Sequence, residues 1–231
     1  MGEDRGVTSP LVLLDLDGTL IDSYPGITGS MTVAFRRCGL PVPTPAELRT
    51  FVGPPIGVSL RAHGVPADRI EEVVRAYRED FAATGMHDAT VFDGVPELLA
   101  DLRAAGCRLA VATSKPEVFA VPICADHGLA PLLDGVFGAS LDESDTKADV
   151  IARALAAESQ PASPEGTVMV GDREHDVHGA RENGLDCVGV TWGYAAPGEL
   201  AAAGAVVVVD TVDELRRTVL ARLDRLVTPR A

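Results

Sequence analysis

Short runs of apolar residues alternate along most of the chain with longer segments of helical period. The apolar runs are Leu11–Leu14, Arg108–Ala112, Val136–Ala139, Thr167–Val170, Cys187–Thr191 and Val206–Val209. The helical segments between them are Val95–Ala105, Glu117–His127, Ala148–Glu158, His175–Asn183 and Val212–Leu226. Near-continuous apolar runs are typical of strands buried on both faces. The alternation therefore predicts an α/β fold, with a parallel sheet and helices on both of its faces.

The interval between residues 23 and 91 breaks this alternation. It holds helical patterns at Ile27–Cys38 and Asp68–Thr84, and Thr44-Pro45-Ala46-Glu47 has the composition of a capped helix start. Residues 51–57, with two prolines and two glycines, are expected to form a rigid turn between helices. We predict a core domain formed by residues 1–22 and 92–231, and an inserted α-helical cap domain formed by residues 23–91.

Composition limits the classes of partner. The 231 residues are 46% apolar, which is enough to bury a core, and their formal net charge is −14. This charge disfavours nucleic acid polymers and anionic membranes, whose phosphates are bound by clustered Lys and Arg. The first apolar run is far shorter than a signal-peptide core or a spanning helix, so we expect a cytoplasmic protein. The four cysteines show no metal-binding spacing and are expected to be reduced packing residues.

Two carboxylates follow the first apolar run directly. In Asp15-Leu16-Asp17-Gly18-Thr19, the period of an extended chain sends Asp15 and Asp17 to the same side. Ligands bind outside the carboxyl ends of the strands in open parallel sheets. Adjacent carboxylates are costly to ionise together unless a cation shares the site, and Mg²⁺ prefers oxygen ligands of this kind. Taken alone, the pair fits a turn cap equally well.

Further polar residues stand at corresponding positions later in the chain. Thr113 and Ser114 follow the second core strand, where hydroxyls and backbone amides suit a phosphate group ahead of a helix. Lys147 precedes a predicted helix, although a cation interacting with that helix alone would favour its other end. Asp172 and Asp176 lie one helical turn apart after the fourth run. Each residue has an ordinary structural explanation, but the joint pattern predicts a metal and phosphate site.

Lysine is rare in this sequence, since Lys115 and Lys147 are the only two. One interpretation is a compositional bias toward Arg. The other is that both sites need a compact ammonium group, which the planar guanidinium of Arg does not replace. The sequence leaves both interpretations open.

Taken in order, these motifs resemble the haloacid dehalogenase superfamily, in particular its phosphoglycolate phosphatase and 5'-nucleotidase-like branch with a helical cap. The resemblance covers the chain after Pro10. It implies a Rossmann-like core with an inserted cap, and a Mg²⁺-dependent phosphatase for a small phosphorylated metabolite. Phosphoglycolate, a nucleoside 5'-monophosphate and a sugar phosphate are the candidate substrates, and both a monomer and a homodimer are open.

The resemblance also implies roles for single residues. Asp15 would be the nucleophile that forms an aspartyl-phosphate, and Asp17 would protonate the leaving oxygen and then activate water. Asp15, the backbone carbonyl of Asp17, and Asp172 would hold Mg²⁺. We expect different environments for the two catalytic carboxylates, with Asp15 ionised at low pH beside the metal and Asp17 holding a proton.

The remaining implied roles concern the phosphoryl group and the substrate. Thr113, Ser114 and Lys147 would hold the transferring group, while Asp176 would support the metal's water ligands or orient Lys147. Phosphoryl transfer requires mainly positioning and neutralisation of oxygen charge, which these groups can supply. Substrate choice is expected to depend on the cap surface facing the crevice, where the candidates are Arg49, Arg61, His63, Tyr77 and Arg78.

Several related activities fit the motifs less well. A dehalogenase of this superfamily usually lacks the carboxylate that Asp17 supplies, and a phosphonate hydrolase would need a cap lysine, which residues 23–91 do not contain. A phosphomutase has the same Asp pair and a cap, so it remains an alternative. A non-catalytic module that binds a phosphorylated ligand is a weaker alternative, because it would not need both Asp15 and Asp17.

Overall fold

A six-stranded parallel sheet forms the centre of the larger part of the protein. The computed structural model describes residues 9–157 and 166–227. The spatial order of the strands is β5 (Gly135–Ala139), β4 (Arg108–Pro116), β1 (Leu11–Leu14), β6 (Thr167–Gly171), β7 (Asp186–Val190) and β8 (Val207–Val209). The chain first builds outward from β1 on one side and then, from β6 onward, on the other. This change of direction beside β1 creates a crevice at the carboxyl ends of the strands.

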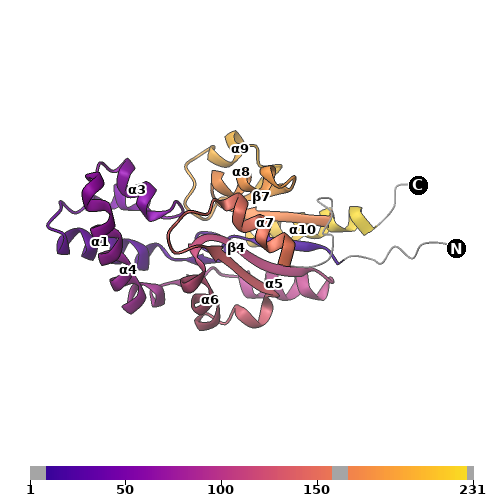
Figure 1. Cartoon of the computed structure of the whole chain (residues 1–231). Coiled ribbons are helices and arrows are strands. Elements are labelled where there is room, and N and C mark those ends of the chain that lie inside the picture. Colours follow the sequence, from indigo (N-terminus) through magenta and orange to yellow (C-terminus); the bar gives the residue numbers. More distant parts are fainter. Residues whose placement is uncertain (1–8, 158–165, 228–231) are drawn as a thin grey trace.

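Helices cover both faces of the sheet (Figure 1). Along β1, Val12 and Leu14 belong to an apolar cluster with α5 (Val95–Ala104), α6 (Glu117–Asp126) and α10 (Val212–Val227). Leu11 and Leu13 belong to a second cluster with α7 (Lys147–Ala157), α8 (Glu174–Glu182) and α9 (Glu199–Ala203). Successive side chains of a strand point to opposite faces, so each strand packs on both layers. The predicted fold class is confirmed.

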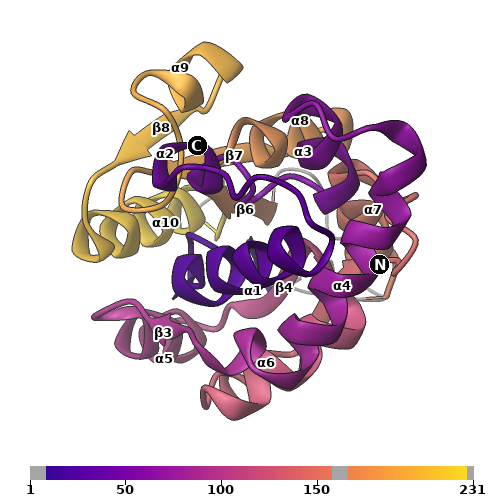
Figure 2. The same cartoon turned by 90° about the vertical axis from the view of Figure 1, so that its left-hand side faces the viewer.

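A group of helices lies at one end of the sheet (Figures 1 and 2). It consists of α1 (Tyr24–Arg37), α2 (Pro45–Arg49), α3 (Ile56–Ala62) and α4 (Ile70–Ala83), with 3₁₀ turns at Ala67–Arg69 and Gly85–His87. A further 3₁₀ turn, Ala130–Leu132, follows α6. The two-residue strands β2 (Ile21–Asp22) and β3 (Thr90–Val91) pair antiparallel where the chain enters and leaves this group. The division at residues 22/23 and 91/92 stays a prediction, and we use "cap" for residues 23–91 in that sense.

The apolar core continues from the sheet into the cap. The cluster that includes Val12 and Leu14 also contains the fully buried cap residues Met31, Phe35 and Phe51. Phe35 and Phe51 meet edge to face, with ring centroids 6.1 Å apart. Cap and sheet therefore share buried apolar surface, which favours their association in this arrangement.

Several local expectations are confirmed. Thr44 and Glu47 form the predicted capping box, with the Thr44 amide donating to the Glu47 carboxylate over 2.7 Å. Gly106 ends α5 in a left-handed conformation, with φ of 85°. All four cysteines are free and buried. Among the described residues, no helix has the length and apolar character needed to cross a membrane.

Other boundaries differ from the predictions. Strand β4 continues to Pro116 instead of ending at Ala112, because its backbone pairs with β5 through a register shift between Thr113 and Pro116. Residues 51–57 are not only a turn, since α3 begins at Ile56. Helix α1 begins three residues early, at Tyr24, whose amide donates to the Asp22 carboxylate. The predicted last residue of the α7 segment, Glu158, lies outside the described residues.

Two glycines of α1 allow a matched test of the cap packing. A Cβ at Gly29 would meet open space, whereas a Cβ at Gly26 would overlap the backbone oxygen of Gly85. We expect Gly29→Ala to raise the free energy of unfolding by about 0.5–1 kcal/mol, because it lowers the entropy of the unfolded chain. We expect Gly26→Ala to lower it by roughly 1–3 kcal/mol through overpacking. Urea unfolding measures both, and equal effects of the two substitutions would contradict this packing.

Candidate active site

Residues from three neighbouring strands meet at one edge of the sheet. Leu14, at the end of β1, pairs with Val111 of β4 and with Val170 of β6, so the segments that follow these residues lie side by side. A small cavity of about 10 Å³ lies there. Its lining includes six of the seven predicted site residues together with Lys115: Asp15, Asp17, Thr113, Ser114, Lys147 and Asp176. The seventh, Asp172, is fully buried next to this group.

Lys147 connects two of the site carboxylates. Its Nζ lies 2.6 Å from Asp15 Oδ1 and 2.7 Å from Asp176 Oδ1, and the Lys147 side chain is only 5% exposed. Burial acts to lower the pKa of Lys147, but the Asp15 and Asp176 charges outweigh it and raise the pKa overall. The ammonium group is therefore permanently charged at neutral pH. It pairs with the site carboxylates, and the alternative of a surface lysine paired with the nearby acidic loop is wrong.

Asp15, Asp172 and Asp176 form a cluster that suits a divalent cation. Each offers a carboxylate oxygen, and these oxygens lie within 4.8 Å of one another. Burial raises the pKa of Asp15 to about 6, with the Asp176 charge adding to this effect and Lys147 opposing it. Burial also raises the pKa of Asp172 well above its usual value, helped by the Asp176 and Asp15 charges. From the sequence, we expect Asp15 to ionise at low pH because a metal ion would lie beside it. Without that ion, the effect of burial on the pKa of Asp15 is larger than the opposing effect of the Lys147 charge.

A dication fits this excess of negative charge. Among the described residues, the ammonium groups that pair with Asp15, Asp17 and Asp176 are those of Lys115 and Lys147, so the four buried carboxylates, Asp172 included, would carry two more negative than positive charges when all are ionised. Carboxylate oxygen is the donor that Mg²⁺ prefers. The carboxylate of Asp17 is not part of the three-residue cluster. The predicted ligand from that residue is its backbone carbonyl, and this assignment stays a prediction.

Asp172 is held by groups on two other segments. Its Oδ2 accepts a 2.7 Å hydrogen bond from the Tyr194 amide, and its Oδ1 accepts from the Thr19 hydroxyl over 3.4 Å. Gly18, with φ of 82°, and Gly193 both approach it so closely that a Cβ at either position would overlap the carboxylate. Glycine at these two positions thus permits the close approach that positions Asp172.

The second carboxylate of the β1 segment has a different partner. Asp17 Oδ2 lies 2.9 Å from Lys115 Nζ, with side chains 8% and 5% exposed respectively. Thr113 is fully buried beside them, and its hydroxyl accepts a hydrogen bond from the Lys115 amide over 3.2 Å. Ser114 is partly buried. Both lysines of the chain therefore lie in the site, each paired with one carboxylate of the Asp15 and Asp17 pair.

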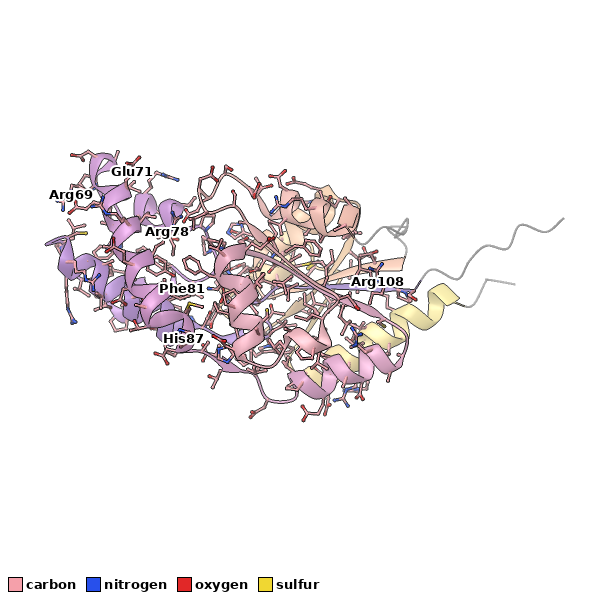
Figure 3. All side chains as sticks on the ribbon, turned by 60° about the horizontal axis from the view of Figure 1, so that its bottom comes forward. Arg69, Glu71, Arg78, Phe81, His87 and Arg108 are labelled. Atoms are coloured by element: carbon pink, nitrogen blue, oxygen red, sulfur yellow. The ribbon has the colours of Figure 1, made fainter. Side chains whose placement is uncertain are left out.

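The cap is tied to the core around the cavity. Glu143, in the loop before α7, accepts from the Gly57 amide and from the Arg78 guanidinium, both over 2.9 Å. On the other side, Arg173 donates to the Val52 carbonyl over 2.8 Å. Figure 3 shows Arg78 and Phe81 on α4. These contacts join the cap to the loops that carry site residues.

The five cap candidates named from sequence have four different surroundings. Tyr77 and Arg78 line a second cavity beside Asp17. Arg49 donates to the Gly193 carbonyl over 3.0 Å and lies over the Tyr194 ring, so it supports the core loop. His63 packs between Phe35 and Phe51, whereas Arg61 is exposed.

Three residues that contribute to the site were not named from the sequence: Thr19, Glu143 and Tyr194. Thr19 lies within the motif that includes Asp15 and Asp17, so its hydroxyl was a visible candidate. Tyr194 and Glu143 carry no local signal. Tyr194 reaches the site because its hydroxyl donates to Asp22 over 2.8 Å while its amide binds Asp172. Glu143 adopts a left-handed backbone with φ of 58°, which is uncommon for a residue with a side chain.

Comparison with known families agrees with this geometry. Residues 12–190 match the model of the haloacid dehalogenase-like hydrolases. The chain belongs to this family. The matched range includes every predicted site residue, and the expected superfamily and enzyme class, a phosphatase of the haloacid dehalogenase type, are confirmed.

Individual relatives carry different names. The chain is 46% identical over 214 residues to the tyrosine-protein kinase PtkA of Mycobacterium tuberculosis, covering 91% of this chain and 72% of that protein. It is 40% identical over 200 residues to a 5'-nucleotidase of Pseudomonas aeruginosa, covering 86% and 90% respectively. Its structure is similar to that of a predicted phosphatase from Clostridium acetobutylicum, with a TM-score of 0.86, 39% identity, and coverage of 92% and 99%.

The excess negative charge makes metal binding measurable through stability. We expect Mg²⁺ at about a hundredfold above its dissociation constant to add roughly 2.7 kcal/mol to the free energy of unfolding. This corresponds to a rise in melting temperature of about 5–10 °C. We expect Asp172→Asn to remove most of this rise and to melt above wild type in EDTA, because a buried like charge is lost. An equal response of both proteins to Mg²⁺ would contradict the assignment.

Proposed function

We propose that this protein is a Mg²⁺-dependent hydrolase of small phosphomonoesters that acts through an aspartyl-phosphate on Asp15. One observation carries the proposal. The Lys147 ammonium binds Asp15 and Asp176 in a buried cavity that Thr113 and Ser114 also line. A nucleophilic carboxylate, a fixed cation and hydroxyl groups thus face the space where a phosphoryl group would be transferred.

The proposed reaction has two steps. In the first, an Asp15 oxygen bonds to phosphorus, the bond from phosphorus to the alcohol oxygen breaks, and that oxygen takes a proton from Asp17. In the second, Asp17 takes a proton from water, which attacks the aspartyl-phosphate and releases inorganic phosphate and free Asp15. Lys147, Thr113 and Ser114 hold the phosphoryl oxygens throughout. Splitting the hydrolysis in this way replaces one difficult step by two easier ones.

The metal assignment uses residues that fit the ion. Asp15, Asp172 and the Asp17 backbone carbonyl would hold Mg²⁺, and Asp176 would support its water ligands and orient Lys147. When bound, the ion supplies positive charge against the phosphoryl oxygens. Support comes from the close approach of the Asp15, Asp172 and Asp176 carboxylates and from the excess of buried negative charge around them.

A small substrate is favoured by the space beside Asp17. That cavity measures about 50 Å³, room for a few water molecules. Tyr77, Phe81 and the Arg78–Glu143 pair also line it. Ranking phosphoglycolate, nucleoside monophosphates and sugar phosphates by kcat/KM would identify the preferred class. We also propose a cytoplasmic location, and we leave monomer and homodimer open.

The kinase name of one relative suggests a second candidate, phosphoryl transfer to a protein tyrosine. Against it, neither lysine follows a glycine, as it would in the phosphate loop of many nucleotide-binding folds. Of the three tyrosines, Tyr77 and Tyr194 are buried and Tyr24 is partly buried, which disfavours self-phosphorylation. Transfer of the terminal phosphate of ATP to a tyrosine peptide would support the kinase. A phosphomutase would convert its substrate without releasing inorganic phosphate.

The nucleophile can be tested with p-nitrophenyl phosphate. We expect wild type with Mg²⁺ to release p-nitrophenol and inorganic phosphate in equal amounts. Asp15→Asn keeps the shape of the side chain but removes its charge, so turnover should fall by at least about a thousandfold. Turnover by the Asn variant, or none by wild type, would contradict the proposal.

The rare lysines provide a separate test. Lys147→Arg keeps a positive charge but replaces a compact ammonium held between two carboxylates by a planar fork. We expect kcat to fall about a hundredfold, because a donor to the transferring group is displaced. A melting curve close to wild type would show that the loss is not due to unfolding. Near-normal turnover would favour a compositional accident.

A further inference from the structure

Lys115 is buried in the site, and the resemblance gives it no role. Its ammonium faces Asp17 Oδ2 at 2.9 Å, whereas Lys147 binds Asp15 and Asp176. A buried lysine is costly unless it is paired, and a buried pair contributes little net stability compared with apolar residues of similar volume. Stability alone is therefore a weak reason for this pair, which lies at the reacting end of the cavity.

The two oxygens of Asp17 have different surroundings. Oδ2 is occupied by Lys115, while Oδ1 is buried without a hydrogen-bond partner among the described residues. Leaving a buried carboxylate oxygen unpaired costs free energy. Asp17 lines both cavities, and Oδ1 is the one of its two carboxylate oxygens that no described protein group binds. Lys115 thus pairs with one Asp17 oxygen and leaves the other without a partner among the described residues.

Lys115 is itself held on two sides. Its amide donates to the Thr113 hydroxyl, which fixes the backbone next to the phosphate-holding residues. Its Nζ lies 4.7 Å from the ring centroid of Phe81, on cap helix α4, and Phe81 packs edge to face on Phe119 of α6. Figure 3 labels Phe81 on this helix. An aromatic ring over the ammonium attracts it and excludes water, which strengthens the ion pair with Asp17.

We propose that Lys115 is a positioning residue that fixes the Asp17 carboxylate so that Oδ1 faces the leaving oxygen of the substrate. The inference rests on the proposed function, in which Asp17 protonates that oxygen as its bond to phosphorus breaks. Lys115 itself neither gives nor takes a proton. Oδ2 can accept the lysine hydrogen bond whether or not Oδ1 carries the proton. The pair therefore assigns one oxygen to proton transfer in both steps of the reaction.

Substrates with different leaving groups separate this role from a structural one. Ethyl phosphate releases a poor leaving group that needs a proton, whereas p-nitrophenolate departs without one. We expect Lys115→Met to lower kcat/KM about a hundredfold for ethyl phosphate, since misplacing a proton donor costs rates of this order. For p-nitrophenyl phosphate we expect a change of less than about threefold. The ratio kcat/KM reports only the steps up to release of the alcohol. The second role of Asp17, which is to take a proton from the attacking water, therefore does not affect this ratio.

Lys147→Met is the matched control, because it removes the other lysine and its contact with Asp15. It should lower kcat/KM for both substrates alike. Equal losses for the two substrates in Lys115→Met would overturn the inference, whereas inactivity of wild type toward both would overturn the proposed function instead. Melting curves of both variants show whether each one is folded. If Lys115→Met does not fold, Lys115→Arg can replace it, because Arg keeps the positive charge but moves the hydrogen-bond donors. We expect Lys115→Arg to lower kcat/KM about tenfold for ethyl phosphate and not for p-nitrophenyl phosphate. Equal losses for the two substrates would again overturn the inference.

Discussion

The burial of four carboxylates beside two lysines is the constraint on which the rest of this structure depends. Asp15, Asp17, Asp172 and Asp176 are at most 7% exposed, and Lys115 and Lys147 are at most 8% exposed. Charges removed from water are costly unless nearby charges and hydrogen bonds compensate them. The Tyr194 amide, the Thr19 hydroxyl and two lysines offset part of this cost. What remains is negative, which favours a bound cation, and that cation together with the lysines would offset the negative oxygens of a phosphoryl group.

The parallel sheet makes this concentration of charge possible. The carboxyl ends of β4, β1 and β6 lie next to one another because the chain changes direction beside β1. Residues separated by more than a hundred positions therefore face a common cavity, supported by strands that are buried on both faces. The cap completes the enclosure with Phe81 over Lys115 and Arg78 on Glu143. Excluding water strengthens each electrostatic interaction inside.

Relatives that are 40% and 46% identical to this chain are named as a 5'-nucleotidase and as a tyrosine-protein kinase. A carboxylate nucleophile with a fixed cation can pass a phosphoryl group to water or to another acceptor. Under the proposed function, the acceptor would then depend on what reaches the cavity, part of which residues 23–91 line. Function within such a family depends on the surroundings of the site more than on the fold.

The sequence by itself determined the fold class and the chemical character of the site. Apolar runs and helical periods are local patterns, so they predicted the six core strands, and strand-end positions predicted the approach of Asp15, Thr113 and Asp172. Local patterns did not predict α3, because its start lies in a segment with proline and glycine, nor the continuation of β4, because pairing with β5 extends it. Only the tertiary structure decided the partners: Lys147 with Asp15, Lys115 with Asp17, and Glu143 with Arg78. The reason is physical, since these pairs join residues distant in sequence and depend on side-chain positions that packing alone fixes.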